Sequence, residues 1–476
     1  MLSEKLRVEK LYCTKHNTKI LNGMQFCLYR SEILGLAGLN GSGRSTLANI
    51  LSGLQSFDAG TILVDGKKQR IADVEQAQKR GIFCVRHQTT LIPELSLLDN
   101  MCMMRWELKN ALHFPAKNLQ RMAKIVLGEL QADISPEEPV RRLTLAQSHR
   151  VEICRAYFCG AKVLILDDIL LSYTEEEEHR LEQLLQRLQK LGVSVMFIDS
   201  RPEPLCRVCT RIIAMEHGRN VGVFYQGDFS AETIRKVLAG ASFQVRRLQR
   251  DADAPLAVCL RAEGVCTDVL KNVDFTVCAG ETVGFIPENT KFASGIVELL
   301  CGRAPLKSGK LLLNGSPLAV GGGTAAMVRQ GIYFLEYYKN CIFPQLTVRE
   351  NLTIAALGQL SGGPTIRRRM ERFVWNENAK ELDIPAELMD RPMRKADNLT
   401  QMKVALYKLL LASPKVILLN NVFSGTDVLL YNCICDFIAE AERRKIAIVY
   451  TAPVDDNVYD VCGRVYRLQD GQTIAQ

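Results

Sequence analysis

The feature that most constrains this chain is a repeat of domain size. Residues 59–66 read AGTILVDG, and residues 308–315, starting 249 positions later, read SGKLLLNG. The run KVLIL at 162–166 recurs as KVILL at 415–419, 253 positions later. Similar blocks in the same order and at nearly the same offset indicate a tandem duplication. The period is that of a whole domain and far exceeds that of a solenoid repeat.

The repeat predicts how the chain is divided. With 476 residues, of which 47% are hydrophobic, the chain can build more than one buried core. A polar stretch from Gln244 to Pro255 separates the two copies. We therefore expect a first domain at 1–240, a linker at 241–255 and a second domain at 256–476.

Strand-like and helical patterns alternate within the first copy. Short apolar runs at 33–37, 163–166 and 193–198 have the pattern of buried strands. Residues 45–54 and 175–191 have the apolar spacing of helices. Alternation of this kind predicts an α/β fold with a largely parallel sheet.

Composition and charge exclude several classes of function. The net charge is +8, a weak excess for this length, and aromatic residues do not interleave with basic runs, so no nucleic acid partner is expected. Charged residues interrupt every apolar stretch well short of the ~18 residues of a membrane-spanning helix, so no direct membrane insertion is expected. The first residues lack the apolar core of a secretion signal. The 16 scattered cysteines favour a reducing compartment, so we expect a cytoplasmic protein.

A glycine-rich segment follows the first strand and opens the first helix. It fits the phosphate-binding pattern GxxxxGK[ST], in which glycines let backbone N–H groups turn toward phosphate oxygens. The helix N-terminus adds positive charge. Arg44 stands where the pattern has lysine, and its guanidinium differs in shape and reach from an ammonium. The candidate nucleotide-binding residues are Gly38, Asn40, Gly41, Ser42, Gly43, Arg44, Ser45 and Thr46.

Further motifs follow this segment along the chain. Gln88 follows a strand, and LTLAQ at 143–147 precedes a helix. The run LILDD at 164–168 ends a strand with two acids, and Thr174 precedes a run of glutamates. With the glycine-rich segment, this set resembles the ATP-binding subunit of a sugar-type ABC importer (ribose, galactose or xylose type) that carries two cassettes in one chain. The resemblance covers nearly the whole chain.

The resemblance implies a fold, ligands and partners. The fold would be two tandem P-loop NTPase cassettes, each with a largely parallel sheet and helices, a helical subdomain and an antiparallel β subdomain. The ligands would be ATP and Mg²⁺. The partners would be membrane-embedded permease subunits, with a sugar-binding protein in the same system. The chain would then lie at the inner face of the cell membrane.

The resemblance also implies roles for individual residues. Gln88 would be the Q-loop glutamine, which serves both catalysis and the metal. Asp167 would be the Walker B aspartate, which holds magnesium together with Ser45. Asp168 takes the position of the catalytic glutamate, and residues 143–147 form the signature that faces ATP in the other cassette.

The first copy departs from the family pattern at chemically important positions. Besides Arg44 and Asp168, Ala146 replaces a signature glycine and Ser200 replaces the switch histidine. A methyl group at Ala146 hinders close approach of the backbone to a γ-phosphate. A shorter acid without its histidine is a poorer base for aligning water. We therefore expect ATP hydrolysis to be weak or lost.

The second copy departs further. Its phosphate-loop region at 287–294 has no glycine and begins with proline, which removes an N–H donor. Asn420 and Asn421 replace the two acids, and neutral amides are poor magnesium ligands. The signature region near Leu399 is expected to be about three residues short. LSGG at 360–363 resembles a signature but lies too far before Asn420.

These observations leave two hypotheses. In the first, the chain is an importer subunit that binds ATP in its first cassette and contacts a sugar permease through segments 91–101 and 343–351. In the second, it is a catalytically inactive cassette module that serves as a nucleotide-responsive or structural and regulatory partner. A permease gene beside this one would favour the first, and a neighbouring sensor or regulator gene would favour the second.

Overall fold

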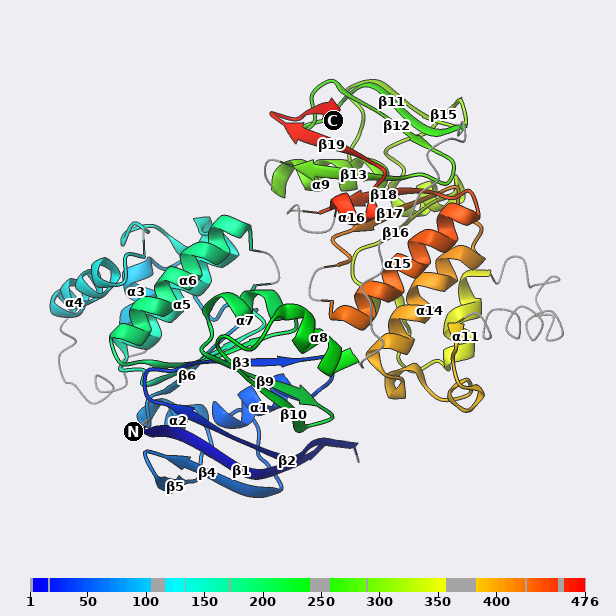
Figure 1. The fold of residues 1–476 in the computed structure, drawn as a ribbon. Coiled ribbons are helices and arrows are strands. Elements are labelled where there is room, and N and C mark those ends of the chain that lie inside the picture. Colours follow the sequence, from blue (N-terminus) through cyan, green and yellow to red (C-terminus); the bar gives the residue numbers. More distant parts are fainter. Residues whose placement is uncertain are drawn as a thin grey trace. The chain divides into compact units, whose positions relative to one another are not determined.

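The computed structural model divides the chain into two compact units, Met1–Phe243 and Gln244–Gln476 (Figure 1). This boundary falls within the predicted linker at 241–255, which lies outside the described residues. The residues that the structure describes are 3–15, 18–103, 116–132, 134–170, 173–239, 257–287, 290–356, 382–423, 426–452 and 458–475.

The first unit combines two sheets with helices. Its strands are β1 (Glu4–Lys15), β2 (Thr18–Tyr29), β3 (Ile33–Gly38), β4 (Ala59–Val64), β5 (Lys67–Gln69), β6 (Ile82–Arg86), β7 (Val163–Asp167), β8 (Ser194–Asp199), β9 (Arg211–Glu216) and β10 (Arg219–Tyr225). Its helices are α1 (Arg44–Leu51), α2 (Val74–Lys79), α3 (Leu97–Met103), α4 (Ala116–Glu129), η2 (Val140–Arg142), α5 (Leu145–Phe158), α6 (Glu175–Lys190), α7 (Pro202–Val208) and α8 (Ala231–Ala239).

The larger sheet of the first unit is mostly parallel. Its strand order is β10-β9-β3-β8-β7-β6, and only the edge strand β10 runs antiparallel to its neighbour. A separate antiparallel sheet has the order β2-β1-β4-β5. The carboxyl ends of β3, β7 and β8 therefore meet at one edge of the parallel sheet, where ligands bind in folds of this kind.

Two hydrophobic cores cover the two faces of this sheet. Along β3, Ile33 and Ala37 join the core beneath α3 to α7, whereas Leu34 and Leu36 join the core shared with α1 and the antiparallel sheet. This alternation is what a strand buried on both faces requires. Figure 1 shows α1 between the two sheets, and α1 begins a short loop after the end of β3.

The second unit has the same set of elements. Its strands are β11 (Val258–Cys266), β12 (Val273–Cys278), β13 (Thr282–Pro287), β14 (Ser308–Leu313), β15 (Ser316–Pro317), β16 (Ile332–Leu335), β17 (Val416–Asn420), β18 (Ala447–Thr451), β19 (Arg464–Gln469) and β20 (Gln472–Ala475). Its helices are α9 (Thr290–Leu300), α10 (Gly323–Arg329), η3 (Tyr338–Cys341), α11 (Val348–Thr353), η4 (Ile354–Ala356), η5 (Ala386–Leu388), η6 (Met393–Lys395), α14 (Asn398–Leu411), α15 (Val428–Arg443) and α16 (Val458–Val461).

The two units share one topology. The larger sheet of the second unit has the order β16-β17-β18-β13-β19-β20, which matches the order of the first unit strand for strand. Its antiparallel sheet, β12-β11-β14-β15, does the same. The predicted α/β fold, with a largely parallel sheet and an antiparallel β sheet in each copy, is confirmed. Within the described parts of the chain, no helix is both long enough and apolar enough to cross a membrane.

Candidate functional site

The glycine-rich segment of the first unit forms a tight loop between β3 and α1. Gly41 and Gly43 have φ angles of 89° and 103°, a region that glycine adopts without steric cost. A side chain at Gly38 would place its Cβ 2.6 Å from the Ser42 Oγ and 2.7 Å from the carbonyl oxygen of Met215. The predicted glycines are therefore required by the backbone itself.

Two features of this loop fit a phosphate ligand. The Ser42 Oγ is buried and has no hydrogen-bond partner among the described residues, so it can donate to a ligand oxygen. In the first turn of α1, the Ser45 Oγ donates to the Asp167 Oδ1 over 3.1 Å, across 122 residues of sequence. A hydroxyl and a carboxylate held together at the helix N-terminus are suitable ligands for magnesium beside a phosphate.

Arg44 lies in the same turn but faces the acids. Its Nη1 is 3.3 Å from the Asp168 Oδ1, and its Nη2 is 3.4 Å from the Asn40 Oδ1. The Arg44 side chain is only 4% exposed. The cation expected to contact phosphates is thus paired with the residue in the position of the catalytic base. Thr46, the last predicted loop residue, lies half-buried in the first turn of α1.

Asp168 occupies a strained turn directly after β7. Its φ is 49°, and its N–H donates to the carbonyl oxygen of Ile198 over 3.1 Å. Burial raises the pKa of Asp168 to about 6, with Asp199 and Asp167 adding to the rise and Arg44 opposing it. Burial likewise raises the pKa of Asp167, and the hydroxyl of Ser45 opposes that rise. Asp168 in this setting can therefore hold or release a proton near pH 6.

Asp199, directly before the Ser200 that replaces the family's switch histidine, is an acid that sequence reasoning did not treat as part of the site. Asp199 ends β8 with 1% of its surface exposed, and its Oδ1 accepts the N–H of Arg201 over 2.8 Å. Its Oδ2 is buried without a partner among the residues described. Ser200, which takes the place of the histidine, is also buried. The sequence signal was the pair Asp199-Ser200 at the end of a strand beside β7.

Gln88 stands apart from this cluster. It lies two residues after β6 and is exposed, and no hydrogen bond within the described chain joins it to Ser45 or Asp167. Its loop is fixed on both sides to α5. The His87 carbonyl oxygen lies 3.0 Å from the His149 Nε2, and the Thr90 N–H donates to the Glu152 Oε1 over 2.7 Å. The catalytic and metal roles assigned to Gln88 remain predictions.

The signature of the first unit caps a helix. Thr144 precedes α5, and its hydroxyl accepts the N–H of Gln147, whose side chain accepts the N–H of Thr144. Ala146 is 2% exposed within the first turn. The helix N-terminus is therefore formed as the motif requires, with a methyl group in place of the signature glycine.

In the second unit, the part of the phosphate-loop region that the structure describes from Thr290 onward is helical. α1 ends at Leu51 and α9 ends at Leu300, 249 positions later, so the helix ends correspond. α1 begins at Arg44, but α9 begins at Thr290, only 246 positions later. α9 is thus three residues longer at its start, 11 residues against 8. Without glycines to hold positive φ angles, the backbone continues as helix, and its N–H groups no longer surround a phosphate.

The acids of the second unit are replaced by an amide network. Asn420 ends β17, as Asp167 ends β7. Its Nδ2 donates to the Glu336 Oε1 over 3.0 Å, and its Oδ1 accepts the hydroxyl of Thr451 over 2.8 Å. Asn421 keeps the left-handed φ of 51° and donates its N–H to the Thr451 carbonyl oxygen. The turn of the backbone is retained, but the carboxylate that Asp167 provides in the first unit is not.

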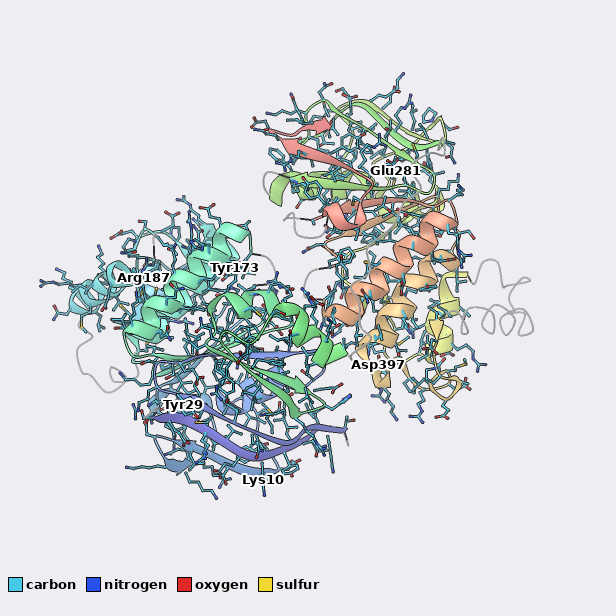
Figure 2. All side chains as sticks on the ribbon, in the orientation of Figure 1. Lys10, Tyr29, Tyr173, Arg187, Glu281 and Asp397 are labelled. Carbon is cyan, nitrogen blue, oxygen red and sulfur yellow. The ribbon has the colours of Figure 1, made fainter. Side chains whose placement is uncertain are left out.

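The expected shortening of the second signature is wrong. α14 has 14 residues, as α5 has, and starts 253 positions after it, the offset that also relates β17 to β7. The N-cap of α14 is Asp397, labelled in Figure 2, whose Oδ1 accepts the N–H of Thr400 over 2.8 Å. Residues 396–400 are therefore the counterpart of 143–147, with Leu399 in place of Ala146. The similar segment 360–363 lies outside the described residues.

One motif that sequence reasoning missed holds the segment after the Q-loop. In the first unit, the buried Asn100 accepts the N–H of Ile92 over 2.8 Å and donates to the carbonyl oxygens of Ile92 and Ser96. In the second unit, Asn351 does the same with Phe343 and Thr347 and also donates to the carbonyl oxygen of Leu346. The signal was the recurrence of asparagine at the same point of both segments.

Comparison with known proteins agrees with this geometry. The ABC transporter family matches the chain twice, at residues 21–170 and 270–424. The chain therefore belongs to the ABC transporter family and consists of two tandem cassettes of the P-loop NTPase fold.

Its relatives span nearly the whole chain. A protein of Caldanaerobacter subterraneus subsp. tengcongensis named ribose import ATP-binding protein RbsA is 28% identical over 459 residues, covering 96% of this chain and 92% of the relative. A protein of Bacillus licheniformis with the same name is 28% identical, covering 98% and 95%. A solved cassette from Clostridium perfringens, part of an ABC transporter complex, is 23% identical with a TM-score of 0.43, covering 47% of this chain and 89% of that one.

Proposed function

We propose that this chain is the ATP-binding subunit of a carbohydrate importer, with one nucleotide site per chain, in the first cassette. The observation that carries the proposal is the contact between Ser45 and Asp167 beside the glycine loop of the first unit. In the second unit, helix α9 extends into the corresponding loop region. The relatives named as ribose import ATP-binding proteins support the carbohydrate class.

The residues of the first cassette have distinct parts in this proposal. The loop from Gly38 to Gly43, with the orphaned Ser42 hydroxyl, would hold the phosphates of ATP. Ser45 and Asp167 would hold Mg²⁺, with Gln88 as a further ligand by resemblance to the family. Bound ATP would supply the free energy for transport. The partners in this reading are membrane-embedded permease subunits and a sugar-binding protein, at the inner face of the membrane.

Hydrolysis at this site is proposed to be weak. Asp168 is one methylene shorter than the family glutamate and is paired with Arg44 at 3.3 Å. A base engaged in an ion pair is less able to accept a proton from water, and loss of a positioned base typically lowers the rate by about 10²–10⁴. Ser200 cannot replace a histidine that would help to orient the reacting groups.

Calorimetric titration with MgATP tests the site. We expect one nucleotide per chain and loss of binding in Gly43→Asp, because Gly43 has a φ of 103° and a Cβ there would lie 2.9 Å from the Ile20 carbonyl oxygen. Gly227→Asp is the matched control, since Gly227 also has a positive φ but its Cβ would meet open space. Two equivalent sites, or none, would contradict the proposal.

Co-purification of the wild-type chain tests the importer role. We expect the chain to co-purify with the permease encoded nearest to its gene. If MgATP binds but no permease associates, the chain is instead a nucleotide-responsive module that acts without a transport cycle.

A further inference from the structure

The helices that follow the two signatures carry basic residues at two matching points, Arg150 with Lys403 and Arg155 with Lys408. α5 and α14 correspond residue for residue at an offset of 253, so Lys408 of α14 takes the place of Arg155 of α5. Arg155 and Lys408 lie beside the segments that follow the Q-loops, but their surroundings differ.

In the first unit, Arg155 is neutralised within the chain. Its Nη2 lies 3.1 Å from the Glu152 Oε1 and donates to the Thr90 Oγ1 over 2.6 Å. The same Glu152 oxygen accepts both the N–H and the hydroxyl of Thr90. The cation, the acid and the loop form one network, in which Arg155 is paired with Glu152.

In the second unit, the acid is missing. The position of Glu152 is occupied by Ala405, and no ion pair or hydrogen bond to Lys408 is present in the described part of the chain. Lys408 is nevertheless only 7% exposed. Its Nζ lies 5.6 Å from the centre of the Phe343 ring, an arrangement in which the ring face attracts the ammonium. Burial lowers the pKa of Lys408, which is the cost of holding this charge away from water.

Two exposed aromatic side chains lie on the loop that packs against α14 near Lys408. Phe343 is 49% exposed and Tyr337 is also 49% exposed, at the two ends of the loop that carries η3. Large aromatic side chains in contact with water beside a buried cation are typical of a contact surface that an apolar and acidic partner can cover.

We propose that Lys408 and Phe343 form a docking site for an acidic side chain of the permease, so that a glutamate or aspartate of the partner supplies the carboxylate that Glu152 supplies in the first unit. The inference rests on the proposed importer function. An incoming carboxylate pairs with an ammonium that is already desolvated, while the Phe343 ring excludes water from the pair. The second cassette then requires an acidic residue of the permease at this site, whereas the first cassette, which has Glu152, does not.

Two substitutions remove the unpaired charge in different ways. Lys408→Met deletes the ammonium and keeps an unbranched apolar side chain, which the buried position tolerates. Ala405→Glu keeps Lys408 but installs the internal acid that the first unit has at Glu152. Lys310→Met is the control, since Lys310 is an exposed lysine on β14 of the antiparallel sheet, outside the loop that carries η3. Each purified full-length variant is titrated against the detergent-solubilised permease, and its MgATP affinity is measured in parallel.

We expect Lys408→Met and Ala405→Glu each to weaken permease binding by about tenfold to a hundredfold, with MgATP affinity unchanged and Lys310→Met like the wild type. Failure of the wild-type protein to bind the permease overturns the importer proposal and this inference with it. Wild-type binding that both Lys408→Met and Ala405→Glu leave unchanged overturns this inference alone. If Ala405→Glu does not fold, Lys408→Met decides the question.

Discussion

At the scale of single residues, Arg44 and Asp168 are complementary in length. Arginine is longer than the lysine of the family pattern, and aspartate is shorter than its glutamate. In this chain the two side chains meet at 3.3 Å. The pair therefore holds the cation at the acid that occupies the position of the catalytic base.

We predict that Arg44→Lys tightens MgATP binding by about three- to tenfold. The ammonium is a compact charge that suits phosphate oxygens, and the shorter side chain gives up its contact with Asp168. Calorimetric titration measures the change. Arg30→Lys, in the exposed ion pair of Arg30 with Asp65, is the control. An unchanged or weaker affinity in Arg44→Lys would show that the cation does not serve the nucleotide.

The raised pKa of Asp168 predicts a pH dependence for any residual turnover. Burial raises the pKa of this carboxyl group to about 6, and only its ionised form can accept a proton from water. Phosphate release should therefore increase as pH rises from about 5 to 7 and level off above that. Asp168→Asn should remove both the activity and its rise with pH. A profile of the same shape in Asp168→Asn would assign the turnover to another group.

The sequence predicted some of these residue contacts and missed others for a physical reason. The meeting of Ser45 with Asp167 was predictable, because carboxyl ends of parallel strands share one edge of a sheet. The pairing of Arg44 with Asp168 was not, because a motif locates a backbone position and leaves the direction of a long side chain undetermined. Asp199 was not singled out, because its burial depends on the packing of β8 between β3 and β7.

At the scale of elements, the strand–helix alternation, the repeat and the start of α6 after Thr174 were readable from the chain, whereas the start of α9 was not. Loss of glycine predicted loss of the second phosphate loop, but not that α9 would extend into it. The second signature was misplaced because it was sought by letter similarity. Asp397 stands at the N-cap of α14, and the preference of N-caps for aspartate was the better signal.

We predict that Asn351→Ala lowers the free energy of unfolding of the second unit by about 2–4 kcal/mol, since buried backbone groups lose their partners. Asn351 is fully buried and makes one hydrogen bond through its carbonyl oxygen and three through its amide nitrogen. Scanning calorimetry measures the loss. Asn340→Ala, at an exposed position of η3, should have little effect. An unchanged melting temperature in Asn351→Ala would mean that the turn holds without this side chain.

At the scale of the whole molecule, the two units retain different parts of the family pattern. The first unit keeps the glycine loop and the contact of Ser45 with Asp167. The second has replaced both, yet its segment after the Q-loop is built on the same asparagine as in the first unit. The second unit thus keeps the turn built on Asn351 without the glycine loop and the aspartate of the first unit. We propose that this turn serves contact with a permease and not the binding of nucleotide.

This division predicts that membrane association can be lost while ATP binding is kept. Ile92 and Phe343 occupy the same point of the two segments and are 40% and 49% exposed. Asp99 and Arg349 are less informative targets, because Asp99 accepts a hydrogen bond from Ser96 and Arg349 pairs with Asp390.

The double variant Ile92→Ser and Phe343→Ser should remain folded, since both side chains already contact water. Co-expressed with the permease, it should move from the membrane fraction to the supernatant, while its MgATP affinity stays within about twofold of the wild type. The change removes apolar area from two docking surfaces at once, and apolar burial is the main source of affinity at such contacts. Tyr459→Ser, which removes another half-exposed aromatic side chain, serves as the control. Retention of the double variant at the membrane would place the contact elsewhere on the chain, and loss of MgATP binding would show that these segments support the nucleotide site instead.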